Sequence, residues 1–160
     1  MDPLILAKKL KEKKQQWIDD LSVIEDPHER FAFVIDLGRE APPLDPQYKV
    51  ATFLIEGCVS DLWLLPEHKD GKCYFQTDAD SLITRGIAVL VSDFYSDQPP
   101  EAIVEEDASF LADVGITQHL SPNRRTGLAN LCQRIRSYAQ HCLDHAGQDN
   151  PGESWIGGDI

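Results

Sequence analysis

Several features are missing from this sequence, and each absence excludes a class of protein. No apolar run approaches the roughly 20 residues that a membrane-spanning helix needs. The N-terminus lacks the apolar core of a secretory signal peptide. No two cysteines stand at the CxxC spacing of structural zinc sites. We therefore expect a cytoplasmic protein with no membrane segment, no metal site, and thiols rather than disulfides.

Positive charge is scarce as well. Lys and Arg number 15 against 27 Asp and Glu, so the net charge is −12. Such a chain repels phosphate backbones, so nucleic acid is not an expected partner, whereas a basic protein surface is. Five lysines nevertheless crowd the N-terminus, and we interpret them as a solvated helix face rather than a membrane anchor: Lys8, Lys9, Lys11, Lys13 and Lys14.

A chain of 160 residues is expected to form a single domain with a substantial core. We place this domain at residues 1–146. Residues 147–160 have no periodicity and several helix breakers, which predicts a disordered tail. Asp2-Pro3 and Asp26-Pro27 each place a capping residue before a first-turn proline. Two N-terminal helices are therefore expected, and Pro42-Pro43 ends the second.

The middle of the chain has the composition of short strands. Val50–Ile55 is β-branched and aromatic, and Asp61–Leu65 and Cys73–Thr77 are similar short apolar segments. Lys69–Lys72 contains an Asp-Gly pair, which tolerates the positive φ angles of a type I′ turn. These segments predict a three-stranded antiparallel meander with one face to be covered.

Helical patterns occupy the rest of the chain. Asp78–Ser81 offers caps for a broadly apolar helix that reaches Phe94, and short helices follow at residues 100–104 and 110–114. Ser121-Pro122 begins a last helix, whose apolar residues recur at spacings of three and four: Leu128, Leu131, Ile135, Tyr138 and Cys142. The predicted class is α+β, a meander covered by N-terminal and C-terminal helices.

Cys58 is the candidate for chemistry. It follows Gly57 in a polar turn between two apolar segments, whereas Cys73, Cys132 and Cys142 fall in a predicted strand or helix. A reactive thiol needs access more than packing. The turn alone leaves open whether Cys58 is a reactive thiol or a buried turn cysteine.

The segment around Cys58, IEGCVSDLWL, resembles the V-x-G-C-x-S-x-V-W-[LI] signature of the SufE family, which includes CsdE-type proteins. Other blocks resemble family segments in the same order: Pro42-Pro43-Leu44, Asp78–Ser81 with Arg85-Gly86, and Gln118–Leu128. The blocks run from about residue 26 to residue 139. The resemblance implies the fold shared by SufE-like and NifU-like proteins.

The resemblance also implies a function. In this family the cysteine at the position of Cys58 accepts sulfur from the persulfide of a cysteine desulfurase of the SufS/CsdA type. It then passes the sulfur to an iron–sulfur scaffold of the SufBCD type. We therefore expect a sulfur carrier and desulfurase activator, not a free-standing enzyme, with no cofactor of its own, as a monomer or homodimer.

Glu56 and Asp61 flank Cys58, and nearby negative charge disfavours a thiolate. By the resemblance, Arg124 is the first candidate for a counter-charge and Arg125 a weaker one. The alternative for Arg124 is a bond to a carboxylate or a loop carbonyl in the first turn of its helix.

Loop support is expected from Gly57 and from Ser60, which resembles the family serine. Asp78 and Asp80 are most simply helix caps, although the resemblance implies that they help to hold the cysteine loop. Val59 departs from the glutamine common in the family, which suggests a loop tucked toward the core.

Two other functions remain as alternatives. An assembly scaffold of the IscU/NifU type would need several thiolates at one site, and only Cys58 stands in a suitable turn. A cysteine hydrolase would need a base for Cys58, with His119 or His68 as candidates.

Overall fold

The computed structural model describes residues 3–57, 60–145 and 150–151. The α-helices are α1 Pro3–Ser22, α2 Pro27–Glu40, α3 Leu82–Tyr95, α4 Pro100–Glu105, α5 Phe110–Asp113 and α6 Pro122–Asp144. The 3₁₀ helices are η1 Pro46–Tyr48, η2 Ala51–Phe53 and η3 Thr117–His119, and the strands are β1 Leu62–Lys69, β2 Lys72–Ala79 and β3 Asn150–Pro151. None of the helices in this described part is long and apolar enough to span a bilayer.

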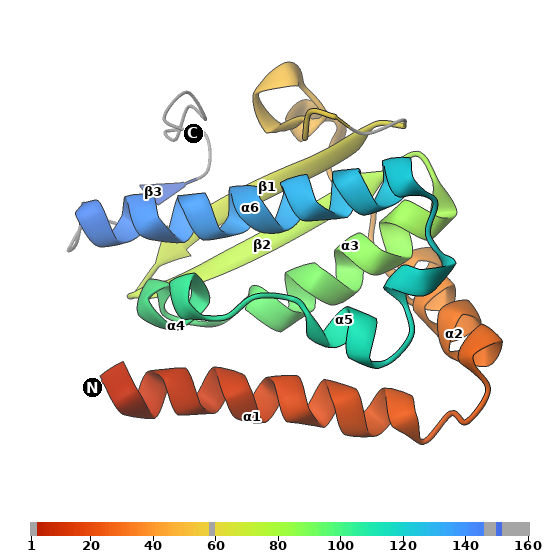
Figure 1. Ribbon diagram of the computed structural model, residues 1–160. Helices are drawn as coiled ribbons and strands as arrows, with labels where there is room; N and C mark the ends of the chain where they lie inside the picture. The colour runs from red at the N-terminus through yellow and green to blue at the C-terminus, as the bar shows by residue number, and fades with distance from the viewer. Residues whose placement is uncertain (1–2, 58–59, 146–149, 152–160) are drawn as a thin grey trace.

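The hairpin of β1 and β2 is the centre of the fold (Figure 1). Its antiparallel register pairs Leu62 with Ala79 and Leu64 with Thr77, so these side chains share one face, which packs against α3 and α6. The opposite face carries Trp63 and its partner, Asp78. The linker between α2 and β1 lies on that opposite face, because Lys49 reaches both residues.

The α+β class is confirmed, but the predicted strand at Val50–Ile55 is wrong. Residues 51–53 form η2, and only Leu54 makes a bridge, to Trp63. The linker is shaped by its own contacts: Asp45 accepts a hydrogen bond from Gln47 N at 3.1 Å, and Lys49 is drawn to Asp78 at 3.1 Å. The local turn at Asp45 and the long-range pair of Lys49 with Asp78 thus compete with the β-propensity of the segment.

The sheet order also differs from a meander. The order is β2-β1-β3, and β3 pairs with β1 through Glu67–Pro151 and His68–Asn150. Asn150 and Pro151 belong to the predicted tail, whose other residues lie outside the described part of the chain, so its disorder stays a prediction.

The predicted hairpin turn is confirmed. Asp70 and Gly71 have φ angles of 53° and 80°, as a type I′ turn requires. The strands extend beyond the predicted ends, from Leu62 to Lys69 and from Lys72 to Ala79.

The helix starts predicted from the sequence are confirmed for α2 and α6, and the cap of α3 needs one correction. Asp26 caps α2 by accepting from His28 N at 2.9 Å, and Ser121 caps α6 by accepting from Arg124 N at 3.3 Å. The cap of α3 is Ser81, which accepts from Thr84 N at 3.4 Å. The cap roles predicted for Asp78 and Asp80 are therefore wrong, because the helix begins only at Leu82.

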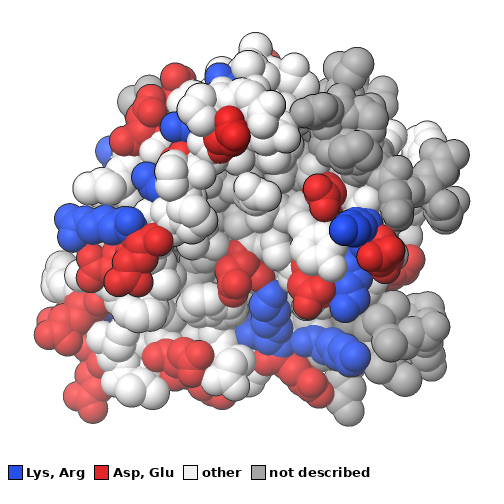
Figure 2. Space-filling model, turned by 180° about the vertical axis from the view of Figure 1, so that it is seen from behind, with Lys and Arg blue, Asp and Glu red and all other residues white. Residues whose placement is uncertain are grey.

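The N-terminal lysines divide into two kinds. Lys9 and Lys11 are exposed, but Lys13 donates to the carbonyls of Asp93 and Ser96, and Lys14 binds Glu106 at 2.9 Å. The expectation of a solvated face therefore holds only in part, because α1 is tied to α3 and α4 by two of these lysines. Elsewhere on the surface, Figure 2 shows acidic side chains spread widely with basic ones between them.

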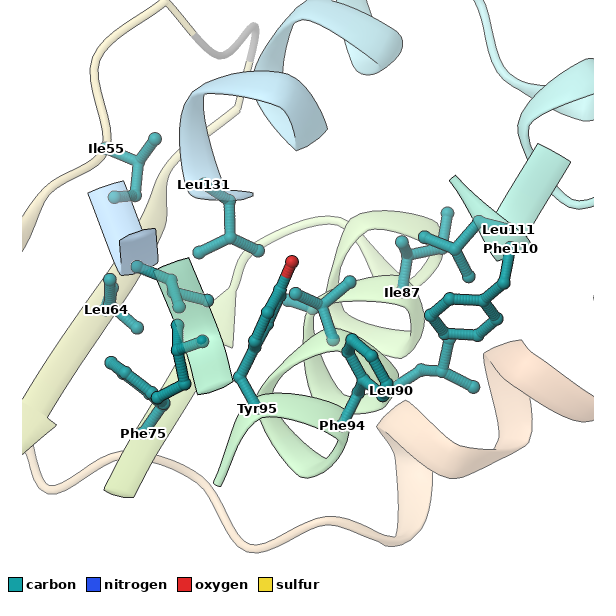
Figure 3. Packing of buried hydrophobic residues seen from close by; sticks show 14 of the residues in the cluster. Ile55, Leu64, Phe75, Ile87, Leu90, Phe94, Tyr95, Phe110, Leu111 and Leu131 are labelled. Carbon is teal, nitrogen blue, oxygen red and sulfur yellow. The ribbon is translucent and has the colours of Figure 1, made fainter. Parts of the chain in front are cut away.

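The core is rich in aromatic residues between α3 and α5, and near the sheet it combines aliphatic residues with Phe75 (Figure 3). Phe94 lies between Tyr95 and Phe110, with ring centroids 4.8 and 4.9 Å away. The apolar stripe predicted for α6 is confirmed in the buried Leu131, Ile135, Tyr138 and Cys142, with Leu128 partly buried. Cys73 is fully buried as well, as expected for a sheet residue.

α2 and α3 cross at two glycines. A Cβ on Gly86 would lie 2.3 Å from the carbonyl oxygen of Val34, and a Cβ on Gly38 would lie 2.6 Å from Gly86 N. Both obstacles are backbone atoms, so neither can move aside as a side chain would.

We expect Gly86→Ala to lower the free energy of unfolding by about 2 kcal/mol, because the two helices must separate to admit the methyl group. Urea denaturation measures the change. Glu40→Ala, at an exposed position of α2, is the control and should alter stability by less than about 0.5 kcal/mol. A Gly86→Ala protein as stable as the wild type would show that the crossing can relax.

Candidate functional site

The turn that carries Cys58 is anchored at both ends. On one side Ile55 N donates to Leu62 O at 2.8 Å, and on the other Asp80 N donates to Asp61 O at 3.0 Å. Cys58 and Val59 lie outside the described residues, so the site is defined by their neighbours. These two bonds confine the turn to the start of β1, beside the connection from β2 to α3.

Gly57 is required by its conformation and by its surroundings. Its φ angle is +83°, in the left-handed region that favours glycine, and a Cβ on it would lie 2.5 Å from Asn130 Nδ2. Any larger residue before Cys58 would therefore strain the turn and displace Asn130. Gly57 and the preceding Glu56 are both exposed.

Asn130 is a residue of this site that the sequence patterns did not reveal. Its side-chain Nδ2 donates to the carbonyl oxygen of Glu56 at 2.8 Å, so α6 holds the turn directly. A weak signal existed, because asparagine is a poor helix former in a helix interior and Asn130 stands next to the buried Leu131.

Arg134 lies one helical turn beyond Asn130 and is half-buried. Burial lowers the pKa of Arg134, while attraction to the Glu56 carboxylate acts in the opposite direction. The guanidinium therefore provides positive charge near the acidic residue that precedes Gly57 and Cys58.

Of the two arginines proposed from sequence, Arg125 is exposed.

Arg124 makes a different contact. Its Nη1 donates to Ser81 Oγ at 2.8 Å, so it joins the start of α6 to the cap of α3. The partner is a hydroxyl, rather than the carboxylate or loop carbonyl expected for a purely structural arginine. Ser81 follows Asp80, which is bonded to the turn at Asp61, so Arg124 lies one element away from the turn.

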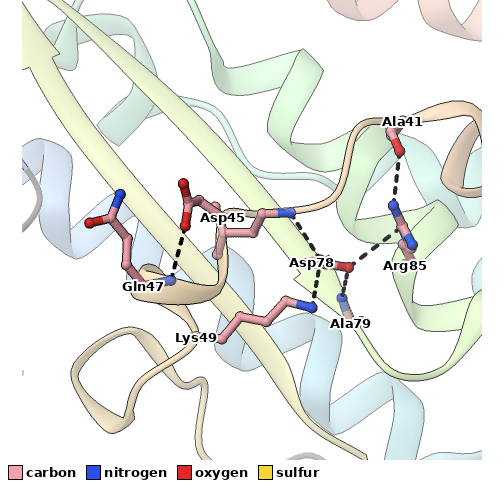
Figure 4. A network of polar contacts seen from close by, with 8 residues as sticks. Ala41, Asp45, Gln47, Lys49, Asp78, Ala79 and Arg85 are labelled. Carbon is pink, nitrogen blue, oxygen red and sulfur yellow. Dashed lines mark hydrogen bonds and ion pairs between the residues drawn. The ribbon is translucent and has the colours of Figure 1, made fainter.

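Asp78 is the most highly connected acidic residue near the site (Figure 4). It is 2% exposed, accepts from Leu44 N at 3.0 Å and Ala79 N at 2.8 Å, and pairs with Lys49 at 3.1 Å and Arg85 at 3.5 Å. Burial acts to raise the pKa of Asp78, but the bonds from Leu44, Lys49 and Ala79 and the charge of Arg85 together hold it below the usual range.

Asp78 therefore fastens the linker to β2 rather than capping a helix. Its contacts reach the linker at Leu44 and Lys49, ahead of the cysteine turn. Asp80, by contrast, is exposed and supports the turn through its main-chain N–H, which donates to Asp61 O. Ser60, the other predicted support residue, is half-buried at the end of the turn.

Two of the cysteines in the described part of the chain, Cys73 and Cys132, are poor nucleophiles. Cys73 and Cys142 are buried, and the hydrogen bond to Cys142, together with burial, raises the pKa of Cys73. Burial raises the pKa of Cys132 to about 12. At neutral pH neither Cys73 nor Cys132 forms a useful fraction of thiolate.

The histidines proposed as bases for a hydrolase lie elsewhere. His119 packs its ring against His28 and Phe31 of α2, at centroid distances of 5.0 and 5.3 Å. His68 pairs with Cys73 beside the hairpin turn, and the length of β1 separates it from the cysteine turn by roughly 20 Å. Across residues 3–57, 60–145 and 150–151, no three His, Cys, Asp or Glu side chains form a group that could hold a metal ion.

Comparison with known proteins agrees with this geometry. The SufE family model, described as an Fe-S metabolism associated domain, matches residues 15–139. This chain belongs to the SufE family. Membership implies a part in iron–sulfur metabolism.

Two curated relatives illustrate the membership. An uncharacterised SufE-like protein of Rhizobium etli is 32% identical over 131 residues, which cover 78% of this chain and 88% of the relative. The chloroplastic/mitochondrial SufE-like protein 1 of Arabidopsis thaliana is 29% identical over 145 residues, 89% of this chain. That match spans only 39% of the plant protein, so this chain corresponds to less than half of its length.

A solved structure supports the fold. The solution structure of a hypothetical protein from Thermus thermophilus superposes with a TM-score of 0.69, covering 82% of this chain and 96% of the other at 18% identity. At that identity the likeness shows the fold alone.

Proposed function

We propose that this SufE-family protein accepts sulfur on Cys58 from the persulfide of a cysteine desulfurase of the SufS/CsdA type. In doing so it stimulates the desulfurase, and it then delivers the sulfur to an iron–sulfur scaffold of the SufBCD type. The observation that carries the proposal is the anchored turn that begins with Gly57 at a φ of +83°, directly before Cys58.

The reaction is a thiol exchange. The Cys58 thiolate attacks the outer sulfur of the desulfurase persulfide and forms a new S–S bond to it. The old S–S bond breaks, and the desulfurase cysteine leaves as a thiolate. The product is a persulfide on Cys58. One sulfur atom passes from the desulfurase to the acceptor, so the step needs no external oxidant or reductant.

The neighbouring residues have defined parts in this proposal. Gly57 and Ser60 support the turn, Asp80 ties it to β2 through the main chain, and Asp78 secures the linker ahead of it. Arg124 is the proposed stabiliser of the thiolate or persulfide, acting from the start of α6. The protein is a carrier with no cofactor of its own, and a reducing compartment such as the cytoplasm suits its thiols.

Mass spectrometry after incubation with a cysteine desulfurase, pyridoxal phosphate and cysteine tests the proposal. We expect one added sulfur atom, located on the peptide that contains Cys58. The peptides of Cys73, Cys132 and Cys142 serve as controls within the same molecule, since Cys73 and Cys142 are buried and the raised pKa of Cys132, about 12, leaves it almost no thiolate. Sulfur spread evenly over all four cysteines, or found on none, would contradict the proposal.

A scaffold of the IscU/NifU type is the competing function. It would need several thiolates beside Cys58. Of the described cysteines, Cys73 and Cys142 are buried in the core and Cys132 lines the groove between α4 and α6. Anaerobic reconstitution with iron and sulfide decides between the two: a stable cluster bound to the protein alone would favour the scaffold.

A further inference from the structure

The contact between α6 and the cysteine turn has a consequence for sulfur transfer. Asn130 Nδ2 lies 2.8 Å from Glu56 O, and a Cβ on Gly57 would lie only 2.5 Å from the same atom. A single side chain thus both bonds the residue before Gly57 and packs on Gly57 itself. Arg134, one turn further along α6, is attracted to the carboxylate of the same Glu56.

We propose that Asn130 is the positioning residue of the sulfur acceptor: its amide locks the Glu56–Gly57 turn onto α6 and so presents Cys58 in the orientation that the desulfurase persulfide requires. The inference rests on the proposed function for the transfer step. Asn130 acts through the turn, and Arg134 supports it by balancing the charge of Glu56.

The magnitude follows from the kind of bond. The donor is half-buried and the acceptor residue is exposed, so water competes for both groups. A hydrogen bond of this kind contributes a modest net free energy, and its loss lowers the equilibrium constant between the held and the free turn by about fivefold. Sulfur transfer, if only the held turn reacts, slows by up to that factor.

Two variants distinguish the hydrogen bond that Asn130 donates from the shape of its side chain. Asn130→Ala removes the donor and the packing, whereas Asn130→Asp keeps the shape but replaces the N–H donor with a carboxylate oxygen. Gln140→Ala is the matched control, because Gln140 carries an amide on the same helix that bonds Asp144, at 3.1 Å, away from the turn. All proteins are compared at a temperature where urea curves show them fully folded.

The measurement is the second-order rate constant for sulfur transfer from the loaded desulfurase to Cys58, read by mass spectrometry. We expect Asn130→Ala and Asn130→Asp to transfer sulfur more slowly than the wild type, by up to about fivefold, and Gln140→Ala to match the wild type. Alkylation of Cys58 by iodoacetamide should change the other way and become faster, because a freed turn meets a small reagent in more conformations. A purely structural role for Asn130 would not move the two rates in opposite directions.

A double-variant cycle tests the contact itself. Gly57→Ala alone places a Cβ 2.5 Å from Asn130 Nδ2, and Asn130→Ala removes that obstacle. The double variant should therefore lose less activity than the product of the two single losses. Losses that simply multiply would contradict the contact.

The outcomes keep the two proposals apart. If the wild type takes sulfur on Cys58 and Asn130→Ala takes it at the same rate, the positioning role is wrong while the proposed function stands. If the wild type takes no sulfur, the proposed function fails, and the alkylation rates still decide the role of Asn130: equal rates in the wild type and Asn130→Ala would overturn it.

Discussion

Cys58→Ser is expected to abolish sulfur uptake and to return the desulfurase to the rate that it has alone. The hydroxyl of serine nearly matches the thiol in size, so the turn keeps its anchors at Ile55 and Asp61. Serine cannot form the S–S bond of a persulfide, and its hydroxyl is far too weak an acid to ionise at neutral pH. The expected result is thus a complete loss of transfer without a loss of folding.

Cys132→Ser is the control for this variant. Cys132 lines the groove between α4 and α6, and burial raises its pKa to about 12, so its replacement should leave uptake and stimulation as in the wild type. Sulfide release by the desulfurase, with each protein present in excess, measures stimulation, and urea curves check folding. Stimulation by Cys58→Ser at the wild-type level would show that the protein activates its partner without accepting sulfur.

How much of the fold can be predicted from sequence depends on the range of the interactions involved. The helix starts at Asp26 and Ser121 and the turn at Asp70-Gly71 depend on contacts within a few residues, and each prediction is confirmed. The segment Val50–Ile55 has the composition of a strand, yet η2 occupies its centre. Just before it, Lys49 is drawn across to Asp78 far along the chain, and no local pattern contains this attraction.

The residues of the candidate site likewise divide into those that depend on local interactions and those that depend on long-range ones. Gly57 could be assigned to a turn because its freedom at positive φ is local. Asn130 could not be assigned to the site from the sequence, because its partner Glu56 is 74 positions away. Arg124 was found through its place in a family block, but its bond to Ser81 is visible only in the folded chain. The residues that hold the turn thus come from α6 and from the β2–α3 connection.

Besides its two main-chain anchors, the cysteine turn depends on two side-chain attachments. One is the direct hold by Asn130 at the surface, and the other is the linker, which Asp78 secures to β2 ahead of the turn. The two side-chain attachments differ in strength. The Asp78 carboxylate is 2% exposed and has four partners, whereas the Asn130 hydrogen bond lies at the protein surface. Loss of the Asp78 carboxylate should therefore lower the stability of the whole fold, whereas loss of the Asn130 amide should mainly affect the conformation of the turn.

Asp78→Asn is accordingly expected to lower the free energy of unfolding by about 3 kcal/mol, the cost of breaking a buried ion pair. The value lies at the low end of that range because Lys49 and Arg85 reach solvent and keep part of their hydration. An asparagine there also presents an NH₂ group to the N–H donors of Leu44 and Ala79. Urea denaturation measures the loss, and Asp80→Asn, at the exposed neighbouring aspartate, should cost less than about 0.5 kcal/mol.

The pH dependence of the Asp78→Asn effect distinguishes the charge from the shape. The pKa of Asp78 is lower in the folded than in the unfolded protein, so the carboxylate contributes stability that is fully present above the unfolded pKa and is lost as pH falls through the folded pKa. The stability gap between the wild type and Asp78→Asn should therefore be largest near about pH 7 and narrow toward about pH 3, where the wild type also begins to lose the charge. A gap that stays constant over this range would mean that Asp78 secures the linker by its shape and hydrogen bonds rather than by its charge.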